Sequence, residues 1–215
     1  MTKIHMISSV IALSVCWLSG CALDASDQSA EQADDGAPSE QASALAKDGE
    51  LANSRADHQG SGDHCVMLAS NEVTCYATFT EAIDVASSGR IKDAPISAKR
   101  ALEDRRFNAR VDALAETPNT SVVVAVLYKD AGYGGSTFTV TKASGCDGNI
   151  NTMDHNFANM GLYGWDDTMG ALHSYSNCRA KVWENINFTG VSTGKAVDYS
   201  SLGLLDDAAS SIEWF

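Results

Sequence analysis

The sequence is poor in positive charge. It contains 15 lysine and arginine residues against 28 aspartates and glutamates, which gives a formal net charge of −13 at pH 7. Binding to nucleic acid requires clustered lysine and arginine side chains that neutralise phosphates. We therefore expect no nucleic acid among the partners of this protein.

Motifs of common enzyme classes are also missing. The sequence has no His-Glu-x-x-His, no Gly-x-Ser-x-Gly and no glycine-rich phosphate-binding loop. His173 lies in a strand-like run, where packing is the expected role, and His155 follows Asp154 in a long connection without a nucleophile beside it. We predict that the protein is not an enzyme.

Residues 22–62 lack phenylalanine, tyrosine and tryptophan. Between Ala22 and Asp63 the chain carries ten carboxylates against Lys47 and Arg55. Such a segment cannot bury enough apolar surface to offset the entropy lost on ordering. We predict a disordered acidic tether at residues 21–62, and the alternative is a tail that binds a basic partner.

A short apolar run opens the chain. The run from Met6 to Leu18 follows Lys3 and is too short to span a bilayer, which requires about 20 apolar residues. It is typical of a secretory signal peptide, here residues 1–20. Its last residues, Leu18-Ser19-Gly20-Cys21, resemble the lipobox of bacterial lipoproteins. The resemblance implies that acylated Cys21 anchors the protein in a lipid bilayer of the cell envelope, at the outer membrane or cell surface. The alternative is an ordinary signal peptide with a chance cysteine.

Residues 63–118 contain local signals for a small hairpin and helices. Cys65 and Cys75 lie in two strand-like runs separated by a polar turn. Thr78 and Glu81 then match a capping box, which predicts the start of a helix.

A second helix is expected from about Ser97 to Ala115. Its basic residues are mixed with acidic ones, which favours a solvated face, and the alternative is a helix that contacts a partner. The basic residues are Lys99, Arg100, Arg105, Arg106 and Arg110.

Two segments of the C-terminal part repeat one spacing of aromatic and glycine residues. Tyr128, Tyr133 and Gly135 recur as Trp183, Phe188 and Gly190. This spacing predicts a folded hairpin in which the second aromatic packs back across the turn and the glycine takes a positive φ.

A second pattern is also repeated, with an acidic pair before a short strand-like run. Trp165-Asp166-Asp167-Thr168-Met169-Gly170 aligns with Leu205-Asp206-Asp207-Ala208-Ala209-Ser210. Together the two repeated patterns resemble the βγ-crystallin family. The resemblance implies an all-β, double Greek-key sandwich at residues 119–215, with one key at 119–177 and the other at 178–215.

Members of that family often bind Ca²⁺, which prefers six to eight oxygen ligands. The resemblance implies one site with a full ligand set and one weaker site, because Gly170 offers no hydroxyl. The alternative is that the acidic pairs only cap turns. The candidate ligands are the side chains of Asp167, Asp207 and Ser210 and the backbone carbonyls of Lys129, Thr168, Glu184 and Ala208, and Asp166 and Asp206 complete the acidic pairs of the sites.

Four cysteines remain beyond Cys21 and allow three disulfide pairings. We expect Cys65–Cys75 and Cys146–Cys178, because each of these pairs lies within one unit of the chain. A zinc site is disfavoured because the Cys-x₂₋₄-Cys spacing is absent.

The expected function is therefore that of a membrane-anchored binding or structural module that binds calcium. The first alternative is an extracellular protease inhibitor of the metalloproteinase type, since such inhibitors exist on this fold, with Asn149–Met160 as its loop. The second is a structural component of the envelope. Fold analogy alone does not separate these functions.

Overall fold

The computed structural model describes residues 62–117 and 121–215, which belong to one compact unit at Glu50–Phe215. The predicted signal peptide at residues 1–20, the lipidated Cys21 and nearly all of the predicted tether lie outside the described residues. Within the described ranges, no helix is long and apolar enough to cross a membrane.

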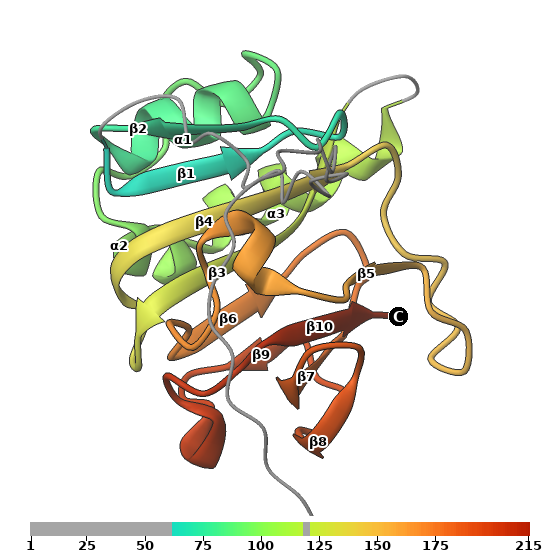
Figure 1. Ribbon diagram of the computed structural model, residues 1–215. Coiled ribbons are helices and arrows are strands. Elements are labelled where there is room, and N and C mark those ends of the chain that lie inside the picture. The colour runs from blue at the N-terminus through green and yellow to red at the C-terminus, as the bar shows by residue number, and fades with distance from the viewer. Residues whose placement is uncertain (1–61, 118–120) are drawn as a thin grey trace, which may run out of the picture. The chain divides into compact units, whose positions relative to one another are not determined.

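Helices come mainly from the first half of the described chain and strands from the second (Figure 1). In chain order the elements are β1 (His64–Met67), β2 (Val73–Tyr76), α1 (Phe79–Ala86), α2 (Ala98–Glu103), α3 (Arg105–Asp112), η1 (Ala113–Glu116), β3 (Val122–Asp130), β4 (Gly134–Lys142), β5 (His155–Phe157), η2 (Met160–Tyr163), β6 (Ala171–Ser174), β7 (Ala180–Asn185), β8 (Thr189–Ser192), β9 (Asp198–Tyr199), η3 (Gly203–Leu205) and β10 (Ser211–Trp214).

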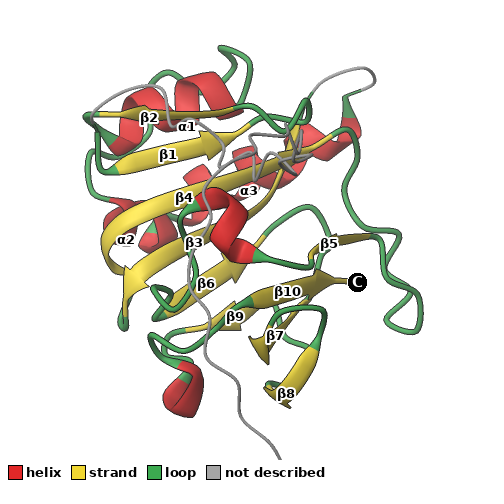
Figure 2. Ribbon diagram, in the orientation of Figure 1, coloured by secondary structure: helices red, strands yellow, loops and turns green. Residues whose placement is uncertain are grey.

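The strands form two sheets (Figure 2). The order is β2-β1-β4-β3-β6-β9 in one sheet and β5-β10-β7-β8 in the other. Strands β3 to β6 form one key and β7 to β10 form the other, and each key sends its third strand to the opposite sheet. Strand β5 pairs with β10, and β9 pairs with β6. This exchange confirms the predicted double Greek-key fold.

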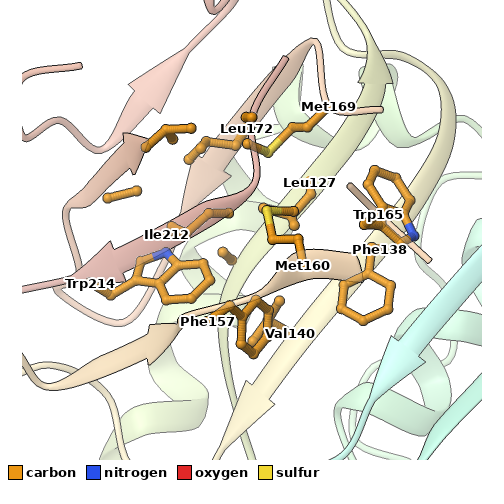
Figure 3. Close-up of a cluster of buried hydrophobic side chains, with 14 of the residues drawn as sticks. Leu127, Phe138, Val140, Phe157, Met160, Trp165, Met169, Leu172, Ile212 and Trp214 are labelled. Atoms are coloured by element: carbon orange, nitrogen blue, oxygen red, sulfur yellow. The ribbon is translucent and has the colours of Figure 1, made fainter. Parts of the chain in front are cut away.

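An apolar core fills the space between the two sheets (Figure 3). Leu172 and Ile212 occupy corresponding positions in the last strands of the two keys, and both are fully buried. Phe138 packs against Trp165 with ring centroids 5.5 Å apart, and Phe157 packs edge-on against Trp214 at 5.1 Å. Phe138 of β4 also packs edge-on against Phe157 of β5 at 6.4 Å, and this contact joins the two sheets.

The N-terminal hairpin extends the first sheet. Strand β1 pairs antiparallel with β2 and parallel with β4 of the first key. The expected disulfide between Cys65 and Cys75 joins two directly opposite residues of this hairpin. Residues 63–118 were predicted to form a segment of their own, and the sheet that they share with the first key was not predicted.

Helix α1 helps to cover the outer face of that sheet. Thr78 and Glu81 form the predicted capping box, in which the Glu81 N–H donates to the Thr78 hydroxyl at 3.2 Å and the Thr78 N–H donates to the Glu81 carboxylate at 3.1 Å. Phe79 and Ile83 of α1 join a second core with residues of β3 such as Val123. Strand β3 is therefore buried on both faces, as its continuous apolar run requires.

The prediction of one continuous helix from Ser97 to Ala115 is wrong. The structure divides it into α2, α3 and η1. Asp104 has an extended backbone (φ −86°, ψ 101°), and its carboxylate accepts from the N–H groups of Arg106 and Phe107 at 2.8 and 3.2 Å. A side chain that caps the next helix in this way ends the preceding one.

The second expected disulfide is also present, between Cys146 and Cys178 with Cα atoms 4.9 Å apart. It ties the long β4–β5 connection to the turn before β7. The Cys178 N–H donates to the Tyr175 carbonyl at 3.0 Å, so that turn is closed by the backbone as well.

Candidate calcium site

The first aromatic hairpin joins β3 to β4 and folds as predicted. Tyr133 packs edge-on against Tyr128 with ring centroids 5.3 Å apart. Gly135 has the expected positive φ of 71°, and Tyr133 itself also lies in the left-handed region at 64°. Burial raises the pKa of the Tyr128 hydroxyl, and burial together with the Asp198 carboxylate raises that of Tyr133.

The second hairpin, between β7 and β8, has the same backbone conformation at its turn as the first hairpin, but its two aromatic rings do not pack against each other in the same way. Phe188 and Gly190 have positive φ values of 60° and 81°, close to those of their counterparts. Trp183 contacts other groups: its indole N–H donates to the Glu213 carboxylate at 2.7 Å, and the Lys181 ammonium lies 3.8 Å from its ring centroid. The predicted aromatic packing across the turn therefore describes the first hairpin only.

The two acidic turns contact each other through a reciprocal pair of backbone hydrogen bonds. The Asp167 N–H donates to the Ala209 carbonyl at 3.1 Å, and the Asp207 N–H donates to the Met169 carbonyl at 3.3 Å. Asp167 and Asp207 have matching φ values of 51° and 53°. The turns are thus related by the same pseudo-symmetry that relates the two keys.

Each acidic turn is also joined to the hairpin of its own key. The Gly170 N–H donates to the Tyr128 carbonyl at 3.0 Å, and the Ser210 N–H donates to the Trp183 carbonyl at 3.0 Å. The next carbonyls along the two hairpins, those of Lys129 and Glu184, are therefore one residue away from these contacts. The predicted ligands come together as two clusters, each containing residues of both keys.

The first cluster comprises Gly170 and the Lys129 carbonyl of one key with Asp206, Asp207 and the Ala208 carbonyl of the other. A Cβ atom on Gly170 would lie 2.5 Å from the Ala131 nitrogen and 2.7 Å from Asp206 Oδ1. A hydroxyl side chain does not fit there, because the backbone and a carboxylate already occupy that space. The first cluster therefore lacks a hydroxyl ligand because the packing around residue 170 excludes any side chain there.

The second cluster comprises Ser210 and the Glu184 carbonyl of one key with Asp166, Asp167 and the Thr168 carbonyl of the other. Ser210 is 8% exposed, so its hydroxyl belongs to a largely dry environment. The Glu184 carboxylate accepts from the Val191 N–H at 3.0 Å, which leaves its backbone carbonyl as the candidate ligand.

The neighbouring serine joins the second acidic turn to the hairpin of its key by two further hydrogen bonds. The Ser211 hydroxyl donates to the Asn185 carbonyl at 2.6 Å and accepts from the Phe188 N–H at 3.1 Å. The corresponding residue of the first key is Ala171, which has no hydroxyl. This contact was not predicted, although the difference between Ser211 and Ala171 in the sequence was the signal for it.

The donor set of the second cluster consists entirely of oxygen atoms. Carboxylate, hydroxyl and carbonyl oxygens are the ligands that Ca²⁺ prefers, and its flexible geometry tolerates loops. No group of three or more histidine, cysteine, aspartate or glutamate side chains suited to a metal occurs in the described part of the chain. Any ion held at this cluster would therefore depend on carbonyl and hydroxyl ligands as much as on carboxylates.

The histidines considered above have defined contacts. His173 lies on β6 with Nδ1 3.1 Å from an oxygen of Asp198, and its ring packs edge-on against Tyr175 at 4.7 Å. His155 begins β5, where its Nε2 lies 3.0 Å from the Ser144 carbonyl oxygen.

The loop expected for a protease inhibitor, Asn149–Met160, is shorter than predicted. Asn156 and Phe157 belong to β5 and pair with β10, and Met160 is buried at 1% exposure. Only the part before β5 projects from the fold, and it presents Ile150 and Met153 at 47% and 44% exposure.

The known proteins that resemble this chain are solved structures with a similar fold. No model of a known protein family matches the sequence, and no curated protein matches it. Similar solved structures include a doubly mutated βγ-crystallin domain from Clostridium beijerinckii (23% identity, 43% of this chain and 96% of that chain, TM-score 0.33). Others are βγ-crystallin domains from Flavobacterium johnsoniae (28%, 43% and 93%, 0.32) and from an archaeon (18%, 43% and 98%, 0.32). The strand exchange between the keys, independently of these similarities, gives the C-terminal part of this chain its βγ-crystallin-like double Greek-key fold.

Proposed function

We propose that this protein is a lipid-anchored envelope module whose double Greek key binds calcium at the second cluster. Two backbone hydrogen bonds support this most directly. The Asp167 N–H donates to the Ala209 carbonyl, next to Ser210, and the Ser210 N–H donates to the Trp183 carbonyl, next to Glu184. The donors come from both keys and match the preference of Ca²⁺ for oxygen.

An ion at this position would act mainly on stability. Its ligands are separated in sequence and come together only when both keys are folded, so it binds the native state and not the unfolded chain. Binding of this kind raises the free energy of unfolding as the ligand concentration rises above its dissociation constant. The expected role is a calcium-stabilised module on the cell surface.

The anchoring part of the proposal is based on the sequence from Leu18 to Cys21. Acyl chains contribute about 0.8 kcal/mol per buried CH₂ group, so a multiply acylated cysteine holds a protein firmly at a bilayer. We expect radiolabelled palmitate to be incorporated into the wild-type protein and not into Cys21→Ser. Equal labelling of both proteins would reject lipidation at this residue.

Calcium binding can be tested with isothermal titration on the protein expressed from residue 22 onward. Asp167→Asn removes the charge of one proposed ligand of the second cluster, Ser210→Ala removes another ligand entirely, and Asp207→Asn is the matched variant in the first cluster. Asparagine tolerates the positive φ that Asp167 and Asp207 adopt, so these exchanges preserve the turn. We expect Asp167→Asn and Ser210→Ala to weaken binding about tenfold or more, because the first removes the charge of a ligand and the second removes a buried ligand.

Asp207→Asn is expected to leave most of the binding heat and of the calcium-induced rise in Tm in place. No heat and no rise in Tm at millimolar calcium would reject the proposal for the wild-type protein. An equal loss in Asp167→Asn and Asp207→Asn would reject the distinction between the clusters.

Protease inhibition is a second candidate, which the exposed Ile150 and Met153 favour. They lie on a loop that the Cys146–Cys178 disulfide holds at its start and the Asp154 N–H holds at its end, through the Trp214 carbonyl at 2.9 Å. If the protein is an inhibitor, Ile150→Asp should weaken its inhibition of extracellular metalloproteinases. Absence of sub-micromolar inhibition in the wild-type protein would exclude this function.

A further inference from the structure

The helical layer carries a positively charged surface, although the protein as a whole is acidic. Residues 90–110 contain seven lysine and arginine residues against three carboxylates, whereas the rest of the chain contains eight against 25. Ala101 of α2 and Phe107 of α3 are buried in the core beneath the helices, so the exposed residues of both helices point away from the first sheet. Five exposed residues of this layer are called the basic surface below: Ile96, Lys99, Arg100, Arg105 and Arg106.

Other cations of the same segment have structural roles that the basic surface lacks. Arg110 forms a bidentate ion pair with Asp93 at 2.6 and 3.0 Å. Arg90 donates to the backbone carbonyls of Ser87 and Ser121, both at 3.0 Å. The four cations of the basic surface form no ion pair with any carboxylate of the described residues. Contacts within the described fold therefore do not account for their charge.

The positions of these four cations also oppose helix stability. Lys99 and Arg100 lie in the first turn of α2, and Arg105 and Arg106 begin α3. The amino end of a helix carries a partial positive charge, which disfavours further cations there. Stability of the helices therefore does not explain this arrangement, whereas attraction of an anionic partner does.

An apolar side chain beside the cations narrows the choice of partner. Ile96 is 81% exposed and directly precedes Ser97, the N-cap of α2. A soluble polyanion would leave this side chain in water. A bilayer surface offers anionic headgroups to the cations and an acyl boundary to the isoleucine, and peripheral proteins bind bilayers through both contacts together.

We propose that the basic surface docks onto a bilayer that contains anionic lipids, with its cations on the lipid phosphates and Ile96 at the acyl boundary. Arginine and lysine both bind phosphate oxygens well. The net charge of −13 does not prevent this contact, because exposed charges more than about 8 Å away are largely screened at physiological ionic strength. The biological setting rests on the proposed anchor at Cys21, which would hold the helices near a membrane and raise their effective concentration there.

Co-sedimentation with lipid vesicles tests the contact on the protein expressed from residue 22 onward. The vesicles contain phosphatidylcholine with about one third phosphatidylglycerol, or phosphatidylcholine alone, since the charge of the lipid is the variable. EDTA is present throughout, so that calcium cannot bridge the acidic turns to phosphate. We expect binding to the anionic vesicles only, and its loss at about 0.5 M salt, where the Debye length is much shorter.

Variants with matched controls separate recognition from fold. Arg106→Gln should weaken vesicle binding about fivefold, the usual effect of one cation near an anionic surface, whereas Arg179→Gln, an exposed arginine before β7, should not. The Tm of Arg106→Gln should equal or exceed that of the wild type, because a cation leaves the start of a helix.

The apolar contact has its own pair of variants. Ile96→Asn should weaken vesicle binding about three- to tenfold, because it removes the inserted side chain. Leu204→Asn should leave binding unchanged, although Leu204 is 92% exposed, because it lies on η3 and outside the basic surface.

Four results would overturn the proposal. They are the absence of binding to anionic vesicles, equal binding to both kinds of vesicle, equal effects of Arg106→Gln and Arg179→Gln, and binding to dextran sulfate without binding to vesicles. The last result would assign the basic surface to a soluble polyanion. Because the protein in this assay carries no lipid, its failure leaves the palmitate labelling of Cys21 unaffected, and the two proposals can fail separately.

Discussion

One residue position distinguishes the two candidate calcium clusters. Gly170 and Ser210 occupy the same place in the two keys. The N–H of each donates to the backbone carbonyl of the first aromatic residue in the hairpin of its own key. Around Gly170 the Asp130–Ala131 backbone and Asp206 leave no room for a side chain, whereas the corresponding residue of the second key is a serine, Ser210. The glycine is therefore required by close packing, in addition to being a poor ligand position.

Restoring the expected hydroxyl should consequently fail. We expect Gly170→Ser to lower the free energy of unfolding by about 1–3 kcal/mol, the usual cost of forcing atoms into a packed interior. Calcium affinity should not rise. Urea unfolding followed by tryptophan fluorescence measures the first effect and isothermal titration the second.

Ser210→Gly is the matched exchange in the other key. It should weaken calcium binding and should destabilise the calcium-free protein less than Gly170→Ser does. A Gly170→Ser protein with wild-type stability and tighter calcium binding would contradict this explanation of the two clusters.

Among the elements, Asp104 decides how the helical segment is divided. The chain has helical residues on both sides of it, but its carboxylate bonds to two N–H groups at the start of α3. We expect Asp104→Ala to lower the free energy of unfolding by about 1 kcal/mol, the typical value for loss of an N-cap. Asp104→Asn keeps an acceptor and should lose much less, as chemical denaturation of both variants can show. Equal losses would assign the effect to charge and not to capping.

Elements that depend on local signals could be predicted from the sequence. The capping box at Thr78 and Glu81, the Cys65–Cys75 hairpin and the two aromatic-glycine hairpins are all encoded within a few residues, and all are present. The parallel pairing of β1 with β4 was not predicted, because it joins residues more than 70 positions apart, such as His64 and Thr137. No short-range pattern specifies such a partner.

A clue to that pairing was nevertheless present in β3. Its run from Val122 to Leu127 is apolar without alternation, which is typical of a strand covered on both faces. In a two-sheet sandwich one face would meet solvent, so the run implied an additional layer. The candidate ligands could be named from the repeat, but their division into two unequal clusters required the contacts of Gly170 and Ser211.

At the scale of the molecule, the helices and the Greek keys depend on one another through β3. Its residues contribute to the core between the sheets and to the core beneath the helices. The Greek-key part contributes five buried residues to the helical core, each no more than 3% exposed: Val123, Val126, Tyr128, Ala171 and Tyr175. The N-terminal segment is therefore a layer of the fold.

Removing that layer should expose a continuous apolar surface. We expect residues 121–215 alone to aggregate or to bind the dye ANS strongly, because large exposed apolar patches promote association. Residues 62–215 should remain monomeric and bind little dye under the same conditions. Size-exclusion chromatography of both fragments makes the comparison, and a monomeric, cooperatively unfolding 121–215 fragment would contradict it.

The central claim is that calcium lies between the keys at the second cluster. Anomalous diffraction at long wavelength from crystals grown with calcium tests it directly. We expect a peak at about 2.3–2.6 Å from the Glu184 carbonyl oxygen, the Ser210 hydroxyl and an Asp167 carboxylate oxygen, which is the normal range of Ca²⁺–oxygen distances. A well-ordered second cluster without such a peak, or a peak confined to the first cluster, would contradict it.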